Sequence, residues 1–131
     1  MYGLMYAMVD RFENVLPNVN QLYMAGLTTA PMVLIEILIM RSMYPSRRMN
    51  AIAFGLSLVL GLGCLVGIRR QAGVGDEQFL KSMIPHHASA LLMCEEAALT
   101  DPEIEELCRK IRAGQQAEID QMRAILARRR R

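Results

Sequence analysis

The sequence predicts an all-α fold in which a transmembrane helical hairpin is followed by a soluble antiparallel helical hairpin. Residues 22–68 contain two long apolar runs with few charges, which is typical of membrane-spanning helices. Residues 76–127 instead place apolar side chains three and four positions apart, with charged side chains between them. A turn-forming break divides each of these two regions, so each is expected to fold back on itself.

Composition limits the chain to one domain, or to one small domain with an anchor, because it has 131 residues of which 53% are hydrophobic. The net charge of +2 hides an acidic stretch at 95–106 and four arginines at 128–131. We interpret these arginines as a solvated tail, because a nucleic-acid-binding surface would add more basic and aromatic residues on a folded face. Three cysteines are too few for a disulfide scaffold.

The predicted membrane hairpin begins after a mixed N-terminal segment. Residues 22–40 carry one charge, Glu36, and residues 51–68 carry none. Each run is about long enough to cross a hydrocarbon core of roughly 30 Å. The first run also holds Pro31, and both it and Glu36 are costly in lipid unless another helix covers them. The spacing Gly63-x-x-x-Gly67 favours close approach of another helix.

The predicted soluble hairpin has recognisable helix ends. Asp76 is expected to cap a helix that runs to about Leu99. Thr100-Asp101-Pro102-Glu103 then combines a capping residue, a proline in the first turn and an acid at the positive helix end. This second helix should end near Ala127. The chain thus divides into an N-terminal segment (1–21), a two-span hairpin (22–70), a linker (71–75) and the C-terminal hairpin (76–131).

Two adjacent apolar stripes run along the first soluble helix, one through Phe79 and Met93 and one through Leu80 and Leu91, and both are predicted to be core. Folding the hairpin at Thr100 places His86 level with Gln115, and Met83 level with Glu118. The polar interruptions of the stripes then lie in a single layer, formed by Met83, His86, His87, Gln115 and Glu118.

This layer predicts a metal site, because a buried polar group without a partner costs about 1–3 kcal/mol and one ion satisfies several such groups. Imidazole nitrogen and thioether sulfur together suit Cu(I). Gln115 or Glu118 would fix the imidazole tautomer by a hydrogen bond. In the alternative interpretation, His86 and Gln115 simply hydrogen-bond across the helix pair and specify its packing.

Other polar residues leave more than one possibility open. Cys94 and Cys108 flank the turn and are compatible with a disulfide, with two free buried thiols, or with soft metal ligands beside Met93. Catalysis is not expected. A di-iron site of the ferritin type needs Glu-x-x-His pairs, and the positions three residues before the histidines are Met83 and Ile84. No glycine-rich phosphate-binding loop is present.

The C-terminal hairpin resembles the domain-of-unknown-function family 305. The resemblance covers residues 76–126 and rests on Asp76-x-x-Phe79-Leu80-x-x-Met83-Ile84-Pro85-His86-His87, on Met93-Cys94 and on matching segments of the last helix. Tyr23-Met24-Ala25-Gly26 and Ala30-Pro31-Met32 are similar to the membrane hairpin of an anchored subgroup. The resemblance implies half of a ferritin-like helical bundle and copper binding outside the cytoplasm. It implies as ligands Met83, His86, His87, Met93 and Met122.

Together these observations predict a non-catalytic, membrane-anchored protein of the bacterial inner membrane that binds copper, as Cu(I), and serves copper tolerance in the envelope. The rival is a structural or interaction module. The wide apolar face of the first soluble helix predicts a homodimer that completes a four-helix bundle. Arg41, Arg47 and Arg48 lie between the spans without an acid. By the positive-inside rule this loop is cytoplasmic and the C-terminal hairpin periplasmic.

Overall fold

The computed structural model describes residues 1–40, 43 and 46–129. Every regular element in these residues is helical, which confirms the all-α prediction. The predicted loop residues Arg41, Ser42, Tyr44 and Pro45 lie outside the described residues, as do the last two arginines. The elements are η1 (Gly3–Met8), η2 (Phe12–Asn14), α1 (Val19–Ile39), α2 (Arg47–Arg70), α3 (Asp76–Glu96) and α4 (Pro102–Arg129).

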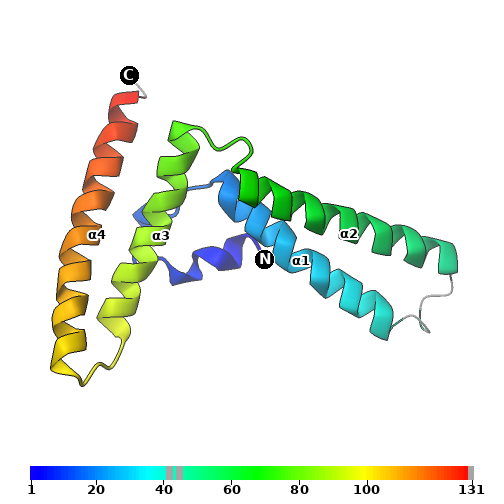
Figure 1. Cartoon of the computed structure of the whole chain (residues 1–131), viewed down its shortest axis with the longest axis horizontal. Helices are drawn as coiled ribbons and strands as arrows, with labels where there is room; N and C mark the ends of the chain where they lie inside the picture. Colours follow the sequence, from blue (N-terminus) through cyan, green and yellow to red (C-terminus); the bar gives the residue numbers. More distant parts are fainter. Residues whose placement is uncertain (41–42, 44–45, 130–131) are drawn as a thin grey trace. The chain divides into compact units, whose positions relative to one another are not determined.

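The helices pair as two hairpins, α1 with α2 and α3 with α4, as Figure 1 shows. The chain forms two compact units, and each is described by itself. The apolar unit consists of Met1–Met5 and Val19–Gly73. The C-terminal unit consists of Tyr6–Asn18 and Val74–Arg131. Most of the N-terminal segment therefore belongs to the unit that contains the C-terminal hairpin.

The two helices of the apolar unit pack closely where small residues face larger ones. A Cβ atom on Gly26 would lie 2.5 Å from the Sγ atom of Cys64, and one on Gly67 would lie 2.8 Å from the ring of Tyr23. Such contacts let helix backbones approach each other, as in membrane helix pairs. Gly67 thus has the predicted role. Gly63 has no atom of the chain within 4 Å of where its Cβ would be, so it makes no such close contact.

Both α1 and α2 are long and apolar enough to cross a membrane, by length and composition. Most of their large apolar side chains are exposed within the chain, which is the arrangement that a lipid environment favours. Pro31 and Glu36 are also exposed, so α2 does not cover them. Glu36 lies in the last turn of α1, where its carboxylate is close to the end of the apolar segment.

The core of the C-terminal unit lies between α3 and α4. Ile84 and Ile119 are fully buried at its centre. Of the two stripes of α3 that were predicted to be core, only one is buried within the chain, and Phe79 and Met93 on the other are 51% and 60% exposed. One partner helix covers only one stripe. The buried cluster consists of Leu80, Ile84, Ala88, Leu91, Ile119, Met122 and Leu126.

The N-terminal residues 6–18 add a third layer to this unit. Val9 and Leu16 pack against the buried cluster of the hairpin. The side chain of Asn14 is buried, and its Oδ1 atom accepts a hydrogen bond of 2.6 Å from the guanidinium of Arg123 on α4. The short helical turns of this segment are therefore stabilised by contacts with residues far along the chain.

The two helices of the hairpin differ in how their N-terminal ends are capped. Oδ1 of Asp101 accepts a hydrogen bond of 2.8 Å from the backbone N–H of Glu103, which confirms the predicted cap of α4. The prediction that Asp76 caps α3 is wrong, because Gly75 occupies the capping position. Asp76 is the first helical residue instead. Its carboxylate accepts a hydrogen bond of 2.6 Å from Arg129 and still faces the positive end of the helix.

Candidate functional site

His87 is the buried polar residue at the centre of the helix pair, with only 9% of its surface exposed. Its Nδ1 atom lies 2.9 Å from the carbonyl oxygen of Met83, one turn earlier on α3, and donates a hydrogen bond to it. Its Nε2 atom lies 2.8 Å from Oε2 of Glu118 on α4. These two contacts fix both the position and the orientation of the imidazole ring.

Both ring nitrogens of His87 thus face oxygen acceptors. The Met83 carbonyl can only accept, so one ring proton resides on Nδ1. The contact with Glu118 is a hydrogen bond when a second proton lies on Nε2 or on the carboxylate. With Nδ1 committed to the backbone, Nε2 is the nitrogen of His87 whose lone pair can reach a ligand.

The backbone around this histidine is shaped by Pro85, which lies inside α3. Proline has no N–H, so the carbonyl of Lys81, four residues earlier, loses its helical hydrogen bond. The side-chain amide of Asn18 lies 3.4 Å from this oxygen and donates to it. Sequence reasoning missed Asn18, although a proline within a predicted helix is a signal that an unpaired carbonyl needs a side-chain partner.

His86 points to a different side of α3 and is exposed. Its ring centroid lies 5.9 Å from that of His87, with the ring planes at 69°. The prediction placed Met83 level with Glu118 and His86 level with Gln115, and the contact in the structure differs from it. His87 is the residue that meets Glu118. Gln115 is half-buried one turn earlier on α4.

The methionines of the predicted site do not gather in one place. Met83 is half-buried and packs against the core cluster, while Met122 is part of that cluster. Met93 is exposed and lies two turns beyond His86, about 10 Å along the helix axis. The structure therefore brings Met83, His87 and Glu118 together and leaves Met93 apart from them.

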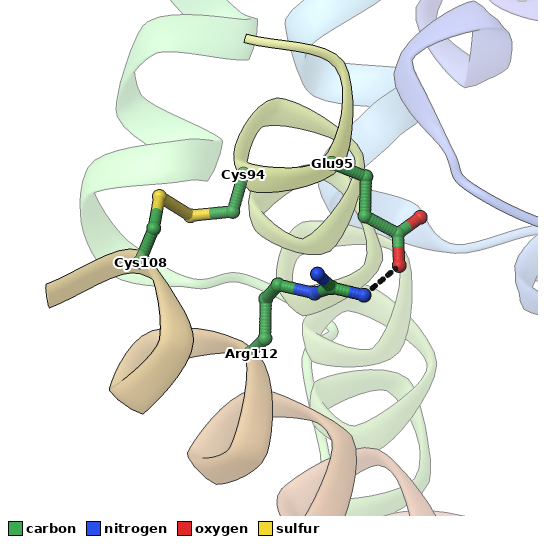
Figure 2. The surroundings of a disulfide bond; sticks show 4 residues. All are labelled: Cys94, Glu95, Cys108 and Arg112. Atoms are coloured by element: carbon green, nitrogen blue, oxygen red, sulfur yellow. Dashed lines mark hydrogen bonds and ion pairs between the residues drawn. A yellow bond between two sulfur atoms is a disulfide. The ribbon is translucent and has the colours of Figure 1, made fainter. Parts of the chain in front are cut away.

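Cys94 and Cys108 form a disulfide with their Cα atoms 5.5 Å apart. Among the three states that the sequence left open, this is the one in the structure. Figure 2 shows the disulfide joining α3 to α4 beside a second link, in which Arg112 donates a 2.9 Å hydrogen bond to Glu95. Disulfide sulfur is not a thiolate, so in this state the two cysteines do not serve as metal ligands. Cys64 in α2 is a free thiol.

The atoms placed against the two ring nitrogens of His87 are oxygens of Met83 and Glu118. Met83 lies four residues before His87 and three before His86, so these side chains project toward neighbouring parts of one helix surface. Glu118 faces them from α4. Within residues 1–40, 43 and 46–129 no group of three or more His, Cys, Asp or Glu side chains is placed to hold a metal ion.

Comparisons with known proteins place the chain in a family. Residues 69–130 match the family model described as "Domain of unknown function (DUF305)". The chain is 31% identical over 111 residues to the uncharacterized protein L153 of Acanthamoeba polyphaga mimivirus. The alignment covers 83% of this chain and 71% of the relative. This alignment is longer than the family match, so it includes residues before position 69. No solved structure matches the chain. The chain belongs to domain-of-unknown-function family 305.

Proposed function

We propose that this protein is a membrane-anchored metal-binding protein whose C-terminal hairpin holds copper, as Cu(I), at His87. The observation that carries the proposal is the orientation of the His87 ring. Its Nδ1–H is held by the Met83 carbonyl, so Nε2 is left as the ligand atom, and a backbone carbonyl bound in this way is the usual support of a metal-ligating histidine.

The donors next to Nε2 suit a soft ion. The thioether of Met83 and the imidazole of His86 lie on the same part of α3 as His87. Sulfur and imidazole nitrogen together favour Cu(I) over the harder divalent ions. Glu118 holds Nε2 in the structure and is released from it when the nitrogen binds a metal. Met122 stays in the core and Met93 lies too far along the helix, so neither belongs to the ligand set proposed here.

The apolar unit serves as the anchor in this proposal. The length and apolar composition of α1 and α2 support two membrane spans. We place the protein in the bacterial inner membrane with the hairpin in the periplasm, as the family resemblance and the arginines at the start of α2 favour. The exposed side of α3 around Met93 is the surface that a second hairpin would cover in the expected dimer.

A second candidate function is supported by the same histidine. Both nitrogens of His87 have oxygen partners within 2.9 Å, so the buried ring is satisfied without a metal. In that case the His87–Glu118 contact specifies the pairing of α3 with α4, and the hairpin is a structural or interaction module.

Titration of the full chain with Cu(I), against a chromogenic competing chelator and with ascorbate present, distinguishes the two candidates. A Cys64→Ser background removes the free thiol. We expect His87→Gln to lower the Cu(I) affinity at least tenfold, and Met93→Leu, the matched control, to leave it unchanged. If the parent chain binds no Cu(I), or if His87→Gln binds it equally well, the packing role remains and the metal site is disproved.

A further inference from the structure

The C-terminal end of α4 is strongly basic, and the proposed metal site makes no use of it. Arg128 and Arg129 are both exposed, and the sequence continues with two more arginines. Arg129 is held by its hydrogen bond to Asp76, so this end of α4 lies beside the first residue of α3. Asp76 offsets one positive charge. Arg128 then leaves the described end of α4 with net positive charge.

A surface pocket of about 460 Å³ opens at the same end of the hairpin. Val74, Phe79 and Ile125 give it an apolar wall, and Asp76 and Arg129 add charged groups to its lining. Phe79 is 51% exposed, so part of its ring is open to a ligand. An apolar wall beside guanidinium groups suits an amphiphile with an anionic head.

The covalent chain keeps this pocket close to the end of α2. Residues 71–73 separate Arg70, the last residue of α2, from Val74 in the pocket wall. Four backbone steps span at most about 14 Å. If α2 crosses a membrane, Arg70 lies at the interface, and the pocket is kept within reach of the lipid headgroups.

We propose that this end of the C-terminal unit binds anionic phospholipid of the bilayer that contains α1 and α2. The lipid phosphate pairs with the arginines at the end of α4, and the apolar part of the lipid contacts Phe79. Arginine suits this role because its planar guanidinium binds phosphate oxygens in pairs. The inference rests on the proposed membrane anchor and is independent of metal binding at His87.

The chain contains no tryptophan, so Phe79→Trp provides a single fluorescent probe in the pocket wall. The full-length variant is placed in nanodiscs of phosphatidylcholine, with or without phosphatidylglycerol, in which some acyl chains are brominated to quench tryptophan. We expect blue-shifted, strongly quenched emission only where phosphatidylglycerol is present, with less quenching at high salt because salt screens the attraction.

Two variants in this background test the arginines. Arg128→Gln/Arg129→Gln should lower the ratio of protein with lipid in the pocket to protein with an empty pocket. The expected decrease is roughly 10- to 30-fold, as for two arginines near an anionic surface. Asp76→Asn breaks the same ion pair but keeps the arginines, so quenching should persist or increase. Arg109→Gln, near the other end of α4, should have no effect.

Three results would overturn the proposal. Equal quenching in neutral and anionic nanodiscs would show that headgroup charge plays no part. Equal loss in Asp76→Asn and in the double arginine variant would show that Arg129 acts only by holding α3. A blue shift that follows the number of protein copies per nanodisc, and not lipid charge, would assign the pocket to a second copy of the chain. Cu(I) affinity should be unaltered in all these variants, which shows that lipid binding and metal binding are tested independently.

Discussion

Nε2 of His87 and Oε2 of Glu118 lie 2.8 Å apart and join α3 to α4 at the middle of the hairpin. The two side chains differ in exposure, at 11% for His87 and 57% for Glu118. The histidine therefore depends on the contact more than the glutamate does, because the glutamate can be solvated without it. This asymmetry determines what each substitution should do.

Replacement of Glu118 should destabilise the C-terminal unit modestly. Glu118→Ala leaves Nε2 of a buried ring without its partner, which we expect to cost about 1 kcal/mol in the free energy of unfolding, given how exposed the glutamate is. Glu118→Gln keeps an acceptor oxygen and should cost less. Chemical denaturation of the full chain in detergent measures both. Equal stability of the parent and the alanine variant would show that the contact contributes nothing.

Substitutions on the two apolar stripes of α3 should differ in their effect on the free energy of unfolding. Ile84 is fully buried, so Ile84→Ala removes methyl groups from a closed core and should cost about 2–5 kcal/mol. Met93 on the other stripe is 60% exposed, and Met93→Ala should change stability by less than about 0.5 kcal/mol. A large loss for Met93→Ala in the purified chain would instead indicate that another copy buries the exposed stripe.

Reduction of the disulfide should loosen the turn end of the hairpin. The bridge joins residues 14 positions apart, and a crosslink over such a loop stabilises a protein by about 3 kcal/mol through the unfolded state. Cys94→Ser/Cys108→Ser should therefore lower the unfolding temperature, and added reductant should have no further effect on it. Maleimide labelling checks the premise. One reactive thiol, that of Cys64, is expected in the denatured, unreduced chain, and labelling of three would contradict it.

The two ends of the protein should lie on the same side of the membrane. Residues 6–18 and 74–129 share one compact unit, and two candidate spans separate them. The arginines at the start of α2 favour a cytoplasmic loop. A C-terminal alkaline phosphatase fusion should then be active, and a C-terminal green fluorescent protein fusion should be dark. The reverse pattern would place the hairpin in the cytoplasm.

Sequence patterns predicted the helices well because each has local signals. The cap at Asp101 and the apolar runs of α1 and α2 are properties of neighbouring residues. The register of α3 against α4 is set by the connection at 97–101 and by the Cys94–Cys108 crosslink, which no periodicity encodes. The predicted pairing placed Met83 level with Glu118, whereas His87 is the residue that contacts Glu118 in the structure. The sequence could thus assign the candidate site to one layer of the hairpin. It could not identify which of the two histidine rings is buried there.

The contact of residues 6–18 with α4 also determines when the protein can finish folding. Asn14 and Arg123 are 109 positions apart, so their hydrogen bond forms only after Arg123 has been synthesised. Until then the buried amide of Asn14 and the apolar side chain of Leu16 have no partner on α4. Truncation before Arg123 should therefore leave residues 6–18 without this contact and open to proteases.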